Sequence, residues 1–257
     1  MLLAFDLDKT LVTDDYRLTD EIADAVGAAR ERGHVVTVLT GRPLVAAHEY
    51  LQRLAIDTPH SVNHGSTIID ADGSLIDRKL LDPGDVADML SHFSADAELE
   101  FSCVVGETLY VRDPEHTRWT YAHAQGRVVT RYDAANRVAA DKVVFHSNGS
   151  SAEIDLELAN RYPKLLRYLW GDGYLEVVPQ MGDKGSALKF IAQRLGFARE
   201  DVVAFGDGLN DVTMIGWAGR GIAVGNDAHD EVLNLASEHI AAPEVGGVAH
   251  WLEQHAR

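Results

Sequence analysis

Short apolar runs recur along the chain, and each of them ends in polar or glycine-rich residues. They occupy residues 2–5, 35–39, 202–205 and 222–224, and they are followed by Asp6, Thr40, Gly206 and Gly225. Runs that are apolar at nearly every position fit strands buried on both faces, as the strands of a parallel sheet are. The pattern therefore predicts four central strands of a parallel sheet.

Helical patterns separate these runs. Residues 18–33 contain Thr19 as a candidate N-cap and Gly33 as a stop signal, and residues 184–196 place apolar residues on one face before a glycine. This alternation of strand and helix predicts a doubly wound, Rossmann-like α/β layer. After the last apolar run, Asp227 is the expected N-cap of a helix.

The middle of the chain has a different pattern. Its alternation is less regular: it indicates strands at 108–113, 142–147 and 174–179 and helices at 82–93 and 151–163. This stretch separates the first two predicted sheet strands from the last two. We therefore expect an α/β core formed by residues 1–81 and 181–257, with an α+β domain inserted at residues 82–180.

The net charge of −17 and the single cysteine narrow the possible function classes. Nucleic acids and anionic membranes both require a basic surface, so the charge argues against either as a partner. Because Cys103 is the single cysteine, the chain can form neither an intrachain disulfide nor a cysteine-rich metal site. Cys103 is expected to be a small core residue. No apolar stretch approaches 18 residues, so no membrane span is expected. Asp6 interrupts the apolar start of the sequence after five residues, so no signal peptide is expected either. These features predict a cytoplasmic protein and leave its oligomeric state open.

Acidic residues follow the predicted strands at the edge where open parallel sheets bind ligands. Asp6 and Asp8 follow the first strand, and Asp207 and Asp211 follow the third. Carboxylates gathered in this way repel one another and need a cation or shared protons. No His/Cys metal spacing occurs, and ligand sets made only of oxygen suit a hard ion, Mg²⁺ before Ca²⁺. Mg²⁺ held by a few carboxylates is an arrangement that handles phosphate.

Four motifs in order are similar to those of a known superfamily. They are DLDKT at 6–10, TGR at 40–42, the lysine of GDKGSAL at 184 and GDGLND at 206–211. Together they resemble the haloacid dehalogenase (HAD) superfamily, and most closely its Cof-type sugar-phosphatase branch. Two positions depart from that branch: Lys9 stands where glycine is usual, and Asn63-His64-Gly65 stands where Asn-Gly-Ala is common.

The resemblance implies a role for each matching residue. Asp6 is the expected nucleophile, which carries an aspartyl-phosphate, and Asp8 is the expected general acid/base. The implied Mg²⁺ ligands are Asp6, the backbone carbonyl of Asp8 and Asp207, with Asp211 as an additional partner. The implied phosphate clamp consists of Thr40, the Gly41 amide, Lys184 and Asn210. Arg42 is a further candidate for substrate binding, although an ion pair with a carboxylate or a cap on the next helix explains it better.

These observations favour a Mg²⁺-dependent phosphomonoester phosphatase that acts on a sugar phosphate or another small phosphorylated metabolite. The inserted domain is expected to act as a cap that excludes water and sets specificity. A phosphotransferase or phosphomutase on the same scaffold and a non-catalytic sugar-phosphate sensor are the alternatives. A receiver-type signalling domain also uses clustered acids, a threonine and a lysine, but it has no place for an insertion of this length.

Overall fold

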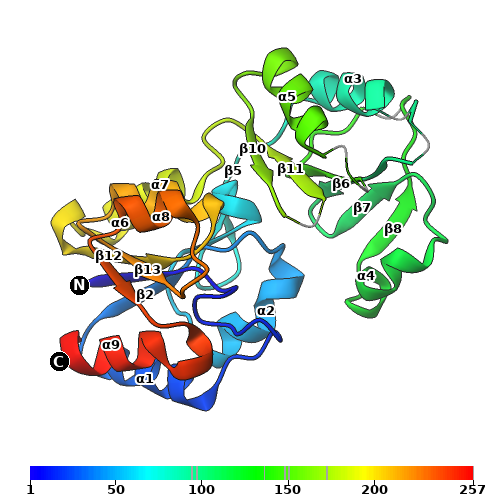
Figure 1. Ribbon diagram of the computed structural model, residues 1–257. Coiled ribbons are helices and arrows are strands. Elements are labelled where there is room, and N and C mark those ends of the chain that lie inside the picture. The colour runs from blue at the N-terminus through cyan, green and yellow to red at the C-terminus, as the bar shows by residue number, and fades with distance from the viewer. Residues whose placement is uncertain are drawn as a thin grey trace. The chain divides into compact units, whose positions relative to one another are not determined.

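The computed structural model contains two compact units (Figure 1). It describes residues 1–256 except positions 94, 97, 136, 148, 150 and 172. The first unit consists of Met1–Arg42, Ala47–Asp77 and Asp183–Arg257, and the second consists of Pro43–Ala46 and Arg78–Gly182. None of the helices in the described ranges has both the length and the apolar content that a membrane crossing requires.

A five-stranded sheet forms the centre of the first unit. Its order is β14-β13-β12-β1-β2, and all of its neighbouring strands run parallel. The strands are β1 (Leu2–Phe5), β2 (Val35–Val38), β12 (Val202–Gly206), β13 (Arg220–Val224) and β14 (Glu238–Ile240). The predicted parallel α/β sheet is confirmed, and β14 extends it at one edge.

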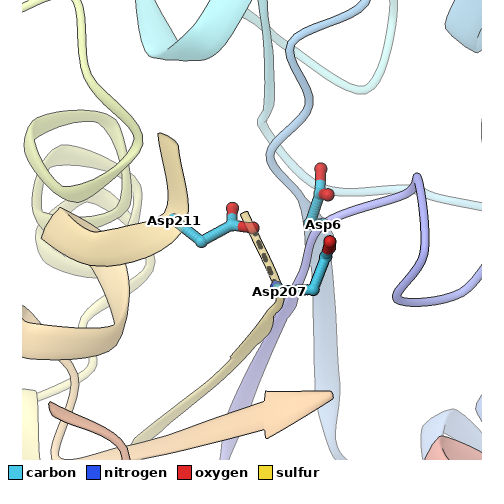
Figure 2. Close-up of side chains that lie close together, drawn as sticks. All are labelled: Asp6, Asp207 and Asp211. Carbon is cyan, nitrogen blue, oxygen red and sulfur yellow. Dashed lines mark hydrogen bonds between the residues drawn. The ribbon is translucent and has the colours of Figure 1, made fainter. Parts of the chain in front are cut away.

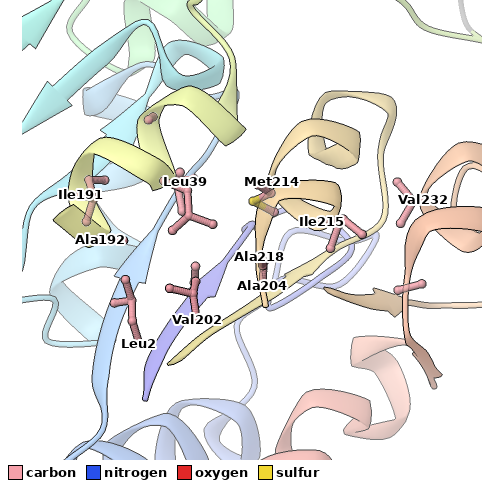
Figure 3. Packing of buried hydrophobic residues seen from close by; sticks show 14 of the residues in the cluster. Leu2, Leu39, Ile191, Ala192, Val202, Ala204, Met214, Ile215, Ala218 and Val232 are labelled. Carbon is pink, nitrogen blue, oxygen red and sulfur yellow. The ribbon is translucent and has the colours of Figure 1, made fainter. Parts of the chain in front are cut away.

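Helices cover both faces of this sheet. Figure 1 shows α6, α7 and α8 on one face and α1 and α9 on the other. The helices of this part of the chain are α1 (Asp20–Glu31), α2 (Leu44–Arg53), α6 (Lys184–Leu195), α7 (Val212–Trp217), α8 (Asp230–Leu235) and α9 (Gly247–His255). In Figure 3, Leu2, Val202 and Ala204 of the sheet pack with Ile191 of α6 and Met214 of α7.

The predicted ends of two helices are confirmed, and one predicted cap is wrong. The Thr19 side chain accepts a hydrogen bond from the Ile22 N–H and caps α1, and α6 ends at Gly196 with φ 78°. Asp227 does not cap α8, because this helix begins only at Asp230 and its N-cap is His229.

A small three-stranded sheet follows α2. It has the order β3-β4-β5, with β3 (His60–Val62) antiparallel to β4 (Thr67–Ile69) and β5 at Leu75–Arg78. The short 3₁₀ helix η1 (Asn63–Gly65) joins β3 to β4.

The second unit has its own sheet and core. The sheet order is β10-β11-β9-β6-β7-β8, and only the β7–β8 pair is parallel. The strands are β6 (Glu100–Val105), β7 (Thr108–Val111), β8 (Val128–Arg131), β9 (Lys142–His146), β10 (Leu166–Leu169) and β11 (Tyr174–Val178). The helices are α3 (Pro83–Phe93), α4 (Thr120–Ala124) and α5 (Ser151–Arg161).

One face of this second sheet packs against α3 and α5. Met89 of α3 and Leu158 of α5 share a buried apolar cluster with Cys103 and Phe145 of the sheet. Burial raises the pKa of the Cys103 thiol to about 12. The expectation that Cys103 is a core residue is confirmed, and its thiol stays protonated at neutral pH.

Candidate active site

The two central strands of the first unit supply two carboxylates. Asp6 directly follows β1 and Asp207 directly follows β12, and these parallel strands place Phe5 opposite Phe205. The Asp6 backbone N–H donates to the Phe205 carbonyl at 3.0 Å and continues this pairing by one residue. Because both strands end at the same edge of the sheet, the Asp6 and Asp207 side chains lie side by side (Figure 2).

Asp211 completes an acidic trio with Asp6 and Asp207. Carboxylate oxygens of the three residues lie within 4.8 Å of one another. Asp211 Oδ2 accepts the backbone N–H groups of Asp207 at 3.0 Å and Gly208 at 2.9 Å, and these bonds direct the Asp211 carboxylate toward the strand end (Figure 2). A Cβ atom at Gly206 would lie 2.5 Å from Asp211 Cγ, so only glycine leaves room for this arrangement.

Lys184 joins two members of the trio. Its Nζ atom lies 2.7 Å from Asp6 Oδ1 and 2.5 Å from Asp211 Oδ1, and its side chain is 0% exposed. Lys184 is the first residue of α6, and the preceding Asp183 caps this helix by accepting the Ser186 N–H. A cation at a helix N-terminus is opposed by the helix dipole. The two carboxylates therefore keep Lys184 charged at this position.

The raised pKa values of Asp6 and Asp207 indicate a deficit of positive charge at the site. Burial raises the pKa of Asp6 well above its usual value; Lys184 lowers it, while Asp211, Asp207 and Asp8 raise it further. Burial, followed by the Asp211 charge, raises the pKa of Asp207 to about 7. Burial alone would lower the pKa of Lys184, but Asp211 and Asp6 raise it. One lysine thus faces three carboxylates, and a divalent cation with oxygen ligands fits the charge and donor set that remain.

Asp8 and Arg42 form a separate pair beside the trio. Arg42 donates from Nε to Asp8 Oδ2 at 2.9 Å and from Nη2 to Asp8 Oδ1 at 2.5 Å. The Arg42 guanidinium carbon lies 4.7 Å from the Tyr50 ring centroid and 5.4 Å from the Tyr16 ring centroid. The planar guanidinium fork matches a carboxylate and stacks on aromatic rings, so these contacts fix the Asp8 carboxylate in place.

The remaining residues of the expected clamp gather at the same edge. Thr40 follows β2, is buried, and accepts the Arg42 N–H on its hydroxyl oxygen at 3.1 Å. Asn210 lies in the 3₁₀ helix Leu209–Asp211, directly before the third carboxylate of the trio. The Asn210 amide nitrogen lies 3.0 Å from the Nδ1 atom of His64, which is close to Gly41.

The second unit has a pocket over one face of its sheet. Its charged lining includes Lys142, whose Nζ atom lies 3.1 Å from both Glu176 carboxylate oxygens, and Arg118, which lies 3.5 Å from Glu100. The aromatic rings of Trp119, Tyr121 and Tyr174 also line this pocket. Paired charges and aromatic rings together are a lining suited to a small polar organic molecule.

Comparison with known proteins decides the family. The family model described as haloacid dehalogenase-like hydrolase matches residues 3–252. The chain belongs to this hydrolase family. It is 30% identical over 268 residues to an HMP-PP phosphatase of Enterobacter sp. (strain 638), covering 98% of this chain and 96% of the relative. It is 28% identical over 256 residues to a 5-amino-6-(5-phospho-D-ribitylamino)uracil phosphatase of Bacillus subtilis (strain 168), covering 98% and 95%.

Solved structures agree on the fold of this HAD hydrolase. A haloacid dehalogenase-like hydrolase from Bacteroides thetaiotaomicron superposes with a TM-score of 0.84 at 23% identity, and a HAD subclass IIB sugar phosphatase superposes with 0.84 at 20% identity. Each match covers 98% of both chains. The family, the fold class and the enzyme class expected from the sequence are confirmed, and the roles of individual site residues stay predictions.

The structure adds residues to this HAD site that the sequence reasoning did not assign. Thr10, the last residue of DLDKT, is fully buried and donates its hydroxyl to Asp207 Oδ1 at 3.2 Å. The sequence signal for Thr10 is its place within DLDKT, four residues after Asp6. Tyr16 and Tyr50 carry no motif, and only the fold brings them to Arg42.

We expect Mg²⁺ to stabilise this hydrolase more at pH 8 than at pH 5.5. Asp207 must lose its proton to bind a cation, so each pH unit below about 7 should weaken the apparent affinity about tenfold. The folded-state pKa of Asp207 lies above the ordinary value of 3.8, so in metal-free protein this group destabilises the fold as the pH rises toward 7. Melting temperatures with and without Mg²⁺ at both pH values measure the difference.

The matched control for this measurement is Asp207→Asn, which removes the titrating group. In this variant the Mg²⁺-induced rise in melting temperature should be small and should depend little on pH. A wild-type rise that is equal at pH 5.5 and pH 8 would contradict the assignment of Asp207 as a ligand.

Proposed function

We propose that this chain is a Mg²⁺-dependent phosphomonoester phosphatase that forms an aspartyl-phosphate on Asp6. The observation that carries the proposal is the position of Asp6, between the buried ammonium of Lys184 and the carboxylate of Asp207 at the strand ends. Phosphoryl transfer gathers negative charge on the equatorial oxygens, so it requires cationic groups around the nucleophile. A bound Mg²⁺, held by Asp6 and Asp207 with Asp211 beside them, would neutralise part of that charge.

The chain's own residues account for both steps of the proposed reaction. An Asp6 oxygen attacks phosphorus, the bond from phosphorus to the ester oxygen breaks, and Asp8 gives its proton to the departing alkoxide. Asp8 then takes a proton from water, the water oxygen attacks phosphorus, and the bond to Asp6 breaks to release inorganic phosphate. Lys184 contacts Asp6 directly and is placed to contact the transferred group throughout.

The substrate we propose is a sugar phosphate or another small phosphorylated metabolite. Two relatives are named HMP-PP phosphatase and 5-amino-6-(5-phospho-D-ribitylamino)uracil phosphatase, and a structural neighbour is named a sugar phosphatase. We further propose that residues 82–180 form a specificity cap, whose pocket recognises the alcohol part of the substrate. The paired charges and aromatic rings that line that pocket support this role.

The direct test is phosphate release from a panel of phosphomonoesters with Mg²⁺ and with EDTA. We expect turnover with Mg²⁺, loss in EDTA, and poor replacement of Mg²⁺ by Ca²⁺ because the larger ion coordinates more loosely. A phosphotransferase would consume the ester only when an acceptor alcohol is added, and it would form a new phosphate ester rather than inorganic phosphate. A sugar-phosphate sensor would bind esters without turnover. Full turnover in EDTA would contradict the metal-carboxylate mechanism.

Removal of the proposed cap should leave a folded but unselective core. The apolar cluster around Leu2 and Met214 draws its members from the first unit, whereas the cluster around Cys103 lies in the second. Replacing residues 82–180 with a short Gly/Ser linker should therefore give a folded protein that slowly hydrolyses small aryl phosphates without preference. Circular dichroism and the substrate panel check this result, and an unfolded core would show that the two parts depend on each other.

A further inference from the structure

The segment Asn63–Gly65 connects the separate motifs of the candidate site. The His64 N–H donates to the Thr40 carbonyl and the Asn63 N–H donates to the Arg42 carbonyl, both at 2.9 Å. A Cβ atom at Gly65 would lie 2.3 Å from the Asp183 carbonyl oxygen, so Gly65 packs directly against the peptide that precedes Lys184. The segment thus holds the TGR loop on one side and the start of α6 on the other.

The backbone of His64 lies in a φ/ψ region that residues with a side chain rarely adopt. Its φ and ψ angles are 63° and 13°, and the preceding Asn63 also has a positive φ of 50°. Glycine adopts this left-handed region freely, whereas other residues pay a conformational cost there. Strained backbone of this kind persists where the surrounding structure fixes it, and it gathers at functional sites. The histidine ring must therefore make contacts that offset the strain.

Those contacts join two residues of the expected phosphate clamp. The His64 residue is 2% exposed, and its Nδ1 atom lies 3.0 Å from the Asn210 amide nitrogen, across 146 positions of sequence. The other contact is with the TGR loop: a Cβ atom at Gly41 would lie 2.4 Å from His64 Cε1. The ring is thus packed between the Gly41 backbone and the Asn210 side chain.

We propose that His64 is a positioning residue that sets the Asn210 amide and the Gly41 backbone for phosphate binding; this inference rests on the proposed phosphatase function. The Asn210 amide nitrogen carries two hydrogens, and donation of one to His64 Nδ1 fixes the plane of the carboxamide. The second N–H then has one direction, and it serves as a donor to a phosphoryl oxygen. The ring, packed on Gly41, keeps the backbone N–H of that residue in the same array.

The test compares His64→Gly, His64→Asn and Asn210→Ala with the wild type. Glycine and asparagine both tolerate the left-handed backbone, so His64→Gly and His64→Asn should melt close to the wild-type temperature. Both should lower kcat between about 10-fold and 100-fold, and raise the inhibition constant of inorganic phosphate by a similar factor, because the donors are misplaced. The Mg²⁺ concentration for half-maximal rate should change by less than about twofold, since the trio keeps its contacts.

The double variant His64→Gly/Asn210→Ala tests whether His64 acts through Asn210. If His64 acts through Asn210, the double variant should be no slower than about twofold below Asn210→Ala alone. Losses that multiply, or wild-type kcat in both His64 variants, would overturn the proposal. His60→Gln is the matched control: His60 is also buried, its Nδ1 atom lies 3.2 Å from the Thr58 carbonyl, and this variant should keep the wild-type rate.

Phosphate release by the wild-type protein tests the proposed function separately from the role of His64. If wild-type protein releases no phosphate from any ester, the phosphatase proposal fails, and orthovanadate then tests His64 by thermal shift. A vanadate-induced shift that is smaller in His64→Asn than in the wild type would support the positioning role. An equal shift in the two proteins would overturn it.

Discussion

The variant Asp6→Asn should fold and lose at least about 10⁴-fold in the rate of phosphate release. A carboxamide oxygen is a much weaker nucleophile than a carboxylate oxygen, and it forms no stable acyl phosphate. The variant should also melt at or above the wild-type temperature in metal-free buffer. Burial and the neighbouring carboxylates raise the pKa of Asp6, so a neutral side chain of the same size removes repulsion at this position.

Two measurements separate this result from a general loss of the site. Beryllium fluoride mimics a phosphorylated carboxylate, so with Mg²⁺ it should raise the melting temperature of the wild type and leave that of Asp6→Asn unchanged. Asp24→Asn, at an exposed position of α1, should behave like the wild type in both assays. Wild-type turnover by Asp6→Asn would show that another group is the nucleophile.

The variant Asp8→Asn should lose activity to an extent that depends on the leaving group. An alkoxide that leaves a sugar phosphate must be protonated, and removal of a general acid costs about 10²- to 10⁴-fold. Nitrophenolate leaves without a proton, so with nitrophenyl phosphate the first step should survive. The second step still lacks its base, and the aspartyl-phosphate should accumulate. Rapid-mixing kinetics should therefore show a burst of nitrophenol followed by slow turnover.

The Arg42 contact makes a second variant a useful comparison for Asp8→Asn. Arg42→Lys keeps a positive charge but loses the two hydrogen bonds to Asp8 and the stacking of the guanidinium on the Tyr16 and Tyr50 rings. If Arg42 only positions Asp8, this variant should show a weaker form of the same leaving-group dependence. Equal losses on both substrates with no burst in Asp8→Asn would remove Asp8 from the acid/base role.

The parts of the fold that the sequence predicts are those set by local pattern. Runs such as Val202–Phe205 are buried on both faces, and the first acid after such a strand must lie at the edge of the sheet, so Asp6 and Asp207 could be placed together. The pattern does not predict strands β8 and β10, because both lie at the edges of their sheet and have a mixed surface pattern instead of a buried apolar run. The sequence predicts a core position for Cys103 but not the strand β6 that contains it.

The contacts that the sequence could not give join residues far apart in the chain. The Arg42 bond to Asp8 spans 34 positions, and the His64 contact with Asn210 spans 146. A carboxylate partner for Arg42 was expected, but several carboxylates were available, and only packing decides among them. The predicted cap of α8 is wrong for a local reason. Residues 226–227 form a turn before the helix begins, so His229 takes the position expected for Asp227.

The neighbours of β1 in the sheet tie the candidate site to the order in which the ribosome makes the chain. The strand β1 pairs with β2 on one side and with β12 on the other, and β12 is not synthesised until Val202. Until then one edge of a wholly apolar strand has no permanent partner, and such edges pair readily with other chains. The apolar core of the second unit, from Leu81 to Val177, is already made by that point. The proposed nucleophile Asp6 therefore directly follows a strand that has one unpaired edge until Val202 is made, and the first unit is the later of the two to complete its sheet.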